Sequence, residues 1–98
     1  MANPELLTAV EKDGEPFGWL AWCTGCNNYH HFDTRWKFDG NQEAPTFSPS
    51  MLAQWSHGPE HEPRRCHSFL RAGVWQYLGD CSHELAGKKV PLEPCPNT

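Results

Sequence analysis

Hydrophobic and polar residues alternate along several short stretches of this chain, as they do in strands that pack one face on a core. The clearest alternation covers residues 30–38, where one face is aromatic and the other is charged. Two further runs, residues 6–10 and 17–22, flank the turn-forming residues 12–15 and predict a hairpin. The pattern therefore predicts a fold built mainly of short antiparallel strands.

A second hairpin is predicted in the stretch RCHSFLRAGVWQYLGDCSHEL, residues 65–85. A two-residue turn at Ala72 and Gly73 would pair the flanking residues so that Cys66 shares a face with Trp75 and Tyr77. His67 would then point to the opposite face. Residues 82–86, which follow this hairpin, are expected to form at most one short helix.

The chain has 98 residues, which is enough for one domain, and its nine Pro and eight Gly indicate many turns. Residues 54–65 are polar and contain two prolines and a glycine, so we predict a surface loop there. Residues 88–92 predict a last strand. Residues 93–98, with two more prolines, predict a loose tail that contains Cys95.

Eight Lys and Arg against twelve Asp and Glu give a formal net charge of -4 at pH 7. This balance argues against nucleic acid as a partner, because such binding depends on clustered cations. No segment approaches the length of about 20 apolar residues that a membrane span needs, and the first ten residues do not resemble a signal peptide. We therefore expect a reducing cytoplasm, where cysteines serve more often as metal ligands than as disulfide partners.

Cysteine and histidine residues gather in short motifs that favour a metal site. The C-x-x-C of residues 23–26 and the C-x-H of residues 81–83 each place two ligands within reach of one ion, and soft ligands with some imidazole favour Zn²⁺. Whether Cys66, His83 or His67 completes the site stays open, as does the choice between one ion and two. The predicted ligands are Cys23, Cys26, Cys66, Cys81 and His83, with His67 as an alternate. The predicted fold is thus a small antiparallel, zinc-ribbon-like and zinc-stabilised domain.

No catalytic residue is predicted. Cys66 and His67 are adjacent, but neighbouring residues on a strand point to opposite faces, which opposes a Cys–His dyad. His83 and Glu84 leave room for a metal-dependent hydrolase as an alternative. Trp55 lies in the predicted polar loop, outside any expected core, and is therefore predicted to bind a partner.

Several motifs taken together resemble a known group of proteins. CTGC followed by HHF, then APTFSPSML, then CHSFLRAGVWQYLGDCSHELAGKKVPL, is similar to a small uncharacterised Cys/His-rich family of tailed phages and prophages, over roughly residues 20–92. The resemblance implies a phage origin, expression inside a bacterial host, and Cys and His positions suited to zinc. It implies no reaction.

These observations favour a non-enzymatic, zinc-binding phage accessory protein that acts as an interaction module. Its partner would be a host factor, or it would be a component of the virion, and its place would be the cytoplasm of the bacterial host or the virion. A small metal-dependent hydrolase is the alternative, so the question of enzymatic activity stays open. The oligomeric state also stays open.

Overall fold

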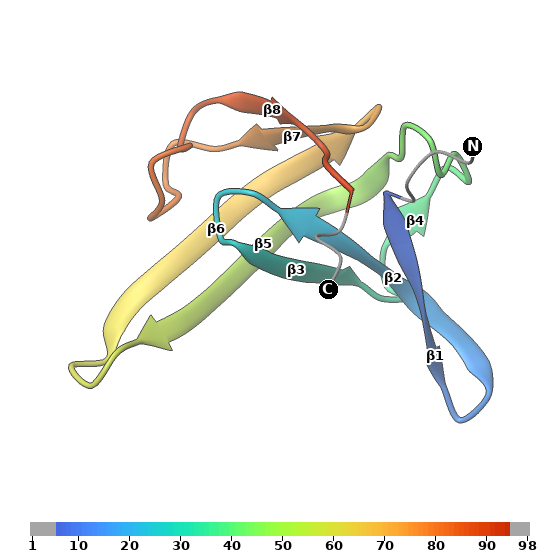
Figure 1. Ribbon diagram of the computed structural model, residues 1–98, viewed down its shortest axis with the longest axis horizontal. Helices are drawn as coiled ribbons and strands as arrows, with labels where there is room; N and C mark the ends of the chain where they lie inside the picture. Colours follow the sequence, from blue (N-terminus) through green and yellow to red (C-terminus); the bar gives the residue numbers. More distant parts are fainter. Residues whose placement is uncertain (1–5, 95–98) are drawn as a thin grey trace.

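A computed structural model describes residues 6–94 of the chain. It consists of two antiparallel sheets, one of three strands in the order β1-β2-β3 and one of five in the order β4-β5-β6-β7-β8 (Figure 1). The described part contains no helix, and so none that crosses a membrane. The predicted class, a mainly β antiparallel domain, is confirmed. The strands are β1 (Leu7–Lys12), β2 (Glu15–Cys23), β3 (Asn28–Phe32), β4 (Lys37–Phe38), β5 (Phe47–His57), β6 (Glu62–Arg71), β7 (Val74–Tyr77) and β8 (Lys89–Pro91).

Both predicted hairpin turns form. Asp13 and Gly14 connect β1 to β2 with φ values of 53° and 81°, and Ala72 and Gly73 connect β6 to β7 with φ values of 48° and 74°. Two successive residues with positive φ match the right-handed twist of the flanking strands. The second turn pairs Leu70 with Trp75, as the sequence predicts.

The single strand predicted over residues 30–38 is wrong. β3 ends at Phe32, and the chain turns before β4 pairs in the other sheet. The carboxylate of Asp33 accepts a hydrogen bond from the backbone N–H of Arg35 at 2.9 Å, and the Asp33 carbonyl accepts one from Trp36 at 3.1 Å. This local turn interrupts the alternation, because an Asp side chain that bonds its own backbone competes with strand pairing.

The surface loop predicted over residues 54–65 is also wrong. Most of this segment belongs to the long β5–β6 hairpin, in which Gln54 pairs with Arg65 and His57 pairs with Glu62. Only residues 58–61 lie between the strands, where the N–H of His61 bonds the carbonyl of Gly58 at 3.1 Å. Polar residues form the outer part of these strands because the pairing of β5 with β6, which begins in the core, continues beyond the core into solvent.

The C-terminal part is partly as predicted. The last strand is shorter than residues 88–92, because β8 covers only Lys89–Pro91. Residues 82–86 form turns instead of a helix. Of the predicted tail, Glu93 and Pro94 have no regular secondary structure, and residues 95–98, including Cys95, lie outside the described residues.

The core lies between the two sheets and is largely aromatic. The rings of Phe32, from the small sheet, and Phe47, from the large sheet, stack with centroids 4.2 Å apart. Trp75 is fully buried, and its indole N–H donates to the carbonyl of Trp22 at 2.9 Å. Aromatic packing and one partly buried hydrogen bond thus fix the small sheet over strands β5 to β7.

Truncating the central ring should weaken the whole domain. We expect Phe32→Ala to lower the free energy of unfolding by about 3–5 kcal/mol, because it removes buried area and leaves a cavity. Urea denaturation followed by tryptophan fluorescence measures this. Leu52→Ala, at a side chain that is 51% exposed, is the control and should change stability by less than about 0.5 kcal/mol. Equal effects from the two variants would contradict the assigned core.

Candidate functional site

Two groups of reactive side chains lie on opposite faces of β6. Cys66 is fully buried and faces the small sheet, whereas the side chain of the next residue, His67, is 28% exposed on the outer face. Successive residues of a strand point to opposite sides, so this adjacent pair serves two different groups. The predicted assignment of Cys66 and His67 to opposite faces is confirmed.

The inner group is a candidate metal centre. Cys23 ends β2, Cys26 lies in the turn that follows, His30 comes from β3 and Cys66 from β6, and their four ligand atoms lie within 4.8 Å of one another. The Sγ atoms of Cys23 and Cys66 are 3.8 Å apart, and Cys26 Sγ lies 3.7 Å from His30 Nε2. These Cys and His side chains therefore lie close enough together to hold a metal ion.

The spacing within this group fits a tetrahedral ion. Zinc–sulfur bonds of about 2.3 Å at tetrahedral angles place two sulfur ligands about 3.8 Å apart, and a sulfur and an imidazole nitrogen slightly closer together. The observed separation of the Cys23 and Cys66 sulfurs, 3.8 Å, agrees with this geometry. It is far too long for a disulfide, and both residues are free cysteines.

A second group shares Cys66 with the first. Cys66, Cys81 and His83 also place their ligand atoms within 4.8 Å of one another, and Cys66 Sγ lies 3.4 Å from His83 Nε2. The His83 ring packs on the backbone of Gly25, where an added Cβ would clash with the imidazole. Glycine in the C-x-x-C turn is therefore needed for His83 to approach the inner group.

The thiols of the inner group act on one another. Hydrogen bonds from Cys26 and Cys66 lower the pKa of Cys23 far below its ordinary value, despite its burial. The hydrogen bond with Cys23 in turn raises the pKa of Cys26 to about 12. The group thus stabilises one thiolate, which is the form of cysteine that binds metals.

The five predicted ligands fall into these two groups, but the set differs in two respects. His30 belongs to the inner group and was not among the predicted ligands, although the alternation of residues 30–38 places it on the aromatic, inward face. His67, the predicted alternate, belongs to neither group. His30 thus completes a set of four with Cys23, Cys26 and Cys66, whereas His83 lies with Cys66 and Cys81 in the second group.

The outer group is a linear chain of hydrogen bonds from a serine to a histidine to an aspartate. Ser50 Oγ lies 3.2 Å from His67 Nε2, and His67 Nδ1 lies 3.2 Å from Asp80 Oδ2. Both distances are within hydrogen-bonding reach. The three residues come from β5, β6 and the turn after β7.

Strand register explains how Ser50 reaches His67. Leu52 is the cross-strand partner of His67, so the two share the outer face, and Ser50 lies two residues before Leu52 on the same strand. The pairing of β5 with β6 is irregular between Phe47 and Met51. Such an irregularity locally re-aims side chains, and here it accompanies the turn of the Ser50 hydroxyl toward the imidazole.

The turn that carries Asp80 is fastened to β6 next to His67. The N–H of Leu78 bonds the His67 carbonyl at 2.9 Å, and Cys81 Sγ lies 3.3 Å from the His67 N and 3.2 Å from its carbonyl oxygen. Beyond it, the N–H of Ser82 donates to the Arg65 carbonyl at 2.8 Å. The same turn thus supplies Asp80 to the outer group and Cys81 to the second group of candidate metal ligands.

The outer group has the chemical parts of an activated nucleophile. With the imidazole proton on Nδ1, Nε2 is free to accept the proton of Ser50, and the Asp80 carboxylate fixes that tautomer. Desolvation acts to raise the pKa of Asp80, but hydrogen bonds from His67, from its own backbone and from Arg65 outweigh it and lower this pKa below its ordinary value. Asp80 is therefore ionised, as this role requires.

The sequence did not predict the outer group. Its three residues are separated by 17 and 13 positions and form no short motif. Ser50 follows a proline-containing stretch that predicts irregular structure, and His67 stands next to Cys66, which favours its interpretation as a metal ligand. The opposite-face argument applied to Cys66 and His67 was the one available signal, because it left His67 without an inner partner.

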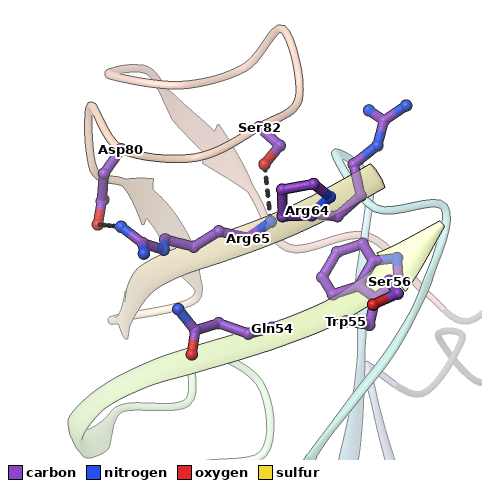
Figure 2. Close-up of a pocket in the computed structure, with 8 residues that line it drawn as sticks. Gln54, Trp55, Ser56, Arg64, Arg65, Asp80 and Ser82 are labelled. Carbon is purple, nitrogen blue, oxygen red and sulfur yellow. Dashed lines mark hydrogen bonds and ion pairs between the residues drawn. The ribbon is translucent and has the colours of Figure 1, made fainter. Parts of the chain in front are cut away.

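A pocket of about 490 Å³ opens beside Asp80 (Figure 2). Gln54, Arg65 and Asp80 line it on one side, and Trp55 lines it toward the end of the hairpin. Trp55 is 40% exposed, as predicted for a residue outside the core. Its role in binding stays a prediction.

Comparison with known proteins gives one match. The family model described as "Bacterial ubiquitination-like system serine protease (BubE)" matches residues 1–78. No curated protein and no solved structure matches the chain.

This match overturns the function predicted from the sequence. An accessory module that binds a host factor or belongs to a virion is wrong, because the matched family is described by a proteolytic activity in a bacterial system. The alternative, a metal-dependent hydrolase, is also wrong, because the family is described as a serine protease. The phage origin stays a prediction, because neither the match nor the structure bears on it.

Cys66 belongs to both groups of candidate metal ligands, so its removal should abolish metal binding. We expect Cys66→Ser to lose the bound metal, whereas only one of His30→Ala and His83→Ala should do so, since a tetrahedral ion takes one further ligand beside three cysteines. Native mass spectrometry of each purified variant counts the ions. His57→Ala, in the exposed hairpin, is the control. Full metal occupancy in Cys66→Ser would contradict the assignment.

Proposed function

We propose a function for this chain as a member of the family of bacterial ubiquitination-like system serine proteases (BubE), to which it belongs because the matched residues make up most of its length. In this proposal the chain is a serine protease. Ser50 is the nucleophile, His67 the general base and Asp80 the residue that orients His67. The hydrogen-bonded chain of these three side chains is the single observation that carries the proposal.

The proposed reaction follows from the positions of these groups. His67 Nε2 takes the proton of Ser50 as Oγ attacks the carbonyl carbon of the scissile bond, and the resulting imidazolium is stabilised by the Asp80 carboxylate. The imidazolium then gives this proton to the leaving amine, which leaves an acyl group on Ser50. A water molecule, deprotonated in turn by His67, hydrolyses the acyl-enzyme and restores the serine.

The metal belongs to the framework in this proposal. The ion is Zn²⁺, held by Cys23, Cys26 and Cys66 with either His30 or His83, and a closed set of four protein ligands is typical of structural zinc. It ties the C-x-x-C turn of the small sheet to β6 and lies on the opposite face from Ser50. Its stabilisation of small domains, about 10–16 kcal/mol in peptides, is comparable to the whole stability of such a domain.

The substrate in this proposal is a protein that takes part in a bacterial ubiquitination-like system. The family description supports this, and so does the position of the half-buried Ser50 on the outer face of a sheet, which a protein segment can approach in an extended conformation. The protease would therefore act with protein partners of that system. The net charge of -4 is consistent with this, since it gives no support for nucleic acid as a partner.

Ser50 is expected to be the site of covalent labelling. A fluorophosphonate probe should add to the wild-type protein at Ser50 and fail to add to Ser50→Ala, and the variant should lose at least about 10³-fold in hydrolysis of p-nitrophenyl butyrate. Intact-mass spectrometry and tandem mass spectrometry locate the adduct. Ser48→Ala, an exposed neighbour on β5, is the control and should be labelled normally. A label on any other residue, or none, would overturn the proposal.

Asp80→Asn should lower kcat while leaving KM nearly unchanged. The amide favours the wrong imidazole tautomer, so we expect a loss of about 10²–10⁴-fold in kcat for p-nitrophenyl butyrate. Steady-state kinetics measures both constants. Asp39→Asn, an exposed carboxylate that caps a turn far along the chain, is the matched control. A wild-type kcat in Asp80→Asn would show that this carboxylate has no part in the reaction.

A further inference from the structure

Asp80 is unusually open for a carboxylate that orients a catalytic histidine. Its side chain is 41% exposed and lies on a turn instead of inside the core. An exposed carboxylate is free to adopt several rotamers and is well hydrated, so its hydrogen bond to His67 is weak unless another group holds it. What holds Asp80 therefore matters for the proposed reaction, on which this inference rests.

Arg65 makes the second contact to the same carboxylate oxygen. Its Nη1 lies 3.3 Å from Asp80 Oδ2, the atom that also accepts from His67 Nδ1 (Figure 2). Arg65 lies two residues before His67 on β6, so both side chains leave the strand on the outer face. β6 thus carries both His67, the proposed base, and Arg65, the cation that contacts the Asp80 carboxylate.

Gln54 fixes this cation in turn. It is the cross-strand partner of Arg65, and its amide faces the guanidinium. The amide nitrogen of Gln54 and the guanidinium nitrogens of Arg65 are all hydrogen-bond donors and cannot pair with one another. The amide orientation that pairs Gln54 with Arg65 is therefore turned by 180° from the one drawn in Figure 2. In that orientation the Gln54 oxygen accepts from both Nε and Nη2 of Arg65, each at 3.1 Å.

The backbone of Arg65 also holds the turn that carries Asp80. Its N–H donates to Ser82 Oγ at 2.7 Å, and its carbonyl accepts from the Ser82 N–H at 2.8 Å. The guanidinium and the main chain of one residue therefore contact the turn on both sides of Cys81. Arg64 differs, because its guanidinium pairs with Glu62 at 3.5 Å and points away from Asp80 in Figure 2.

We propose that Arg65, held in place by Gln54, is a positioning residue that fixes the exposed Asp80 carboxylate against His67. Ser50 and Gln54 lie on β5, and His67 and Arg65 lie on β6. One pair of strands thereby supplies the nucleophile, the base and the two residues that substitute for burial of the aspartate. The guanidinium acts on the reaction only through Asp80.

The test uses p-nitrophenyl butyrate, a small uncharged ester that offers no carboxylate to Arg65. Arg65→Met and Gln54→Leu should each lower kcat about 10–100-fold with KM within about twofold, because a small misplacement of a catalytic group slows the reaction without weakening binding. Gln54→Glu keeps the acceptor and should restore most of the activity. Arg64→Met is the matched control and should keep the wild-type kcat.

A double variant separates positioning from a merely structural role. In the Asp80→Asn background, Arg65→Met should cause no further loss of kcat, because a residue that acts through Asp80 has nothing left to position. Thermal unfolding and metal content, measured on every variant, show that the proteins are folded. A wild-type kcat in Arg65→Met, a rise confined to KM, or losses that multiply in the double variant would each overturn the inference.

The two proposals fail differently. If the fluorophosphonate labels Ser50 and Ser50→Ala is inactive while Arg65→Met keeps full activity, only the positioning role is wrong. If the wild-type protein neither hydrolyses the ester nor reacts with the probe, the proposed protease activity is overturned, and the positioning role with it.

Discussion

The alternation of side chains along β6 is the constraint on which both groups of reactive residues depend. Cys66 faces the core and His67 faces outward because neighbouring residues of a strand cannot point the same way. A metal centre and a hydrogen-bonded serine, histidine and aspartate can therefore occupy adjacent positions in the chain without competing for the same side chain. The strand between them separates a buried, thiol-rich environment from one that is open to solvent.

The turn after β7 connects these two environments. Asp80 reaches the outer group, Cys81 contacts the backbone of His67, and His83 reaches Cys66 on the inner side. Its conformation is fixed by hydrogen bonds to β6 and not by a helix or strand of its own. A metal ion bound by the second group would hold this turn through Cys81 and His83 on one side, while Arg65 holds it on the other, so the framework and the proposed chemistry share one segment.

The small sheet has a supporting part in this arrangement. It supplies Cys23, Cys26 and His30 to the inner group and covers the aromatic core through Phe32, but contributes nothing to the outer group. The large sheet carries Ser50 on β5 and His67 on β6, two neighbouring interior strands whose long pairing fixes their separation. Proteolytic function in this proposal thus rests on one rigid hairpin, with the rest of the domain holding that hairpin and its adjoining turn.

The sequence by itself determined the mainly β class, two of the hairpin turns and most of the residues able to bind a metal, because these depend on local chemistry. The turns at residues 13–14 and 72–73, the opposite faces of Cys66 and His67, and the closeness of two ligands within each C-x-x-C or C-x-H motif all follow from short-range rules. Only the tertiary structure decided that residues 54–65 extend a hairpin and that His30 joins the inner group. It alone brought Ser50, His67 and Asp80 together, because these residues are separated by 17 and 13 positions. Their meeting depends on the register of β5 against β6 and on the path of the turn after β7, which are set by pairing between distant segments.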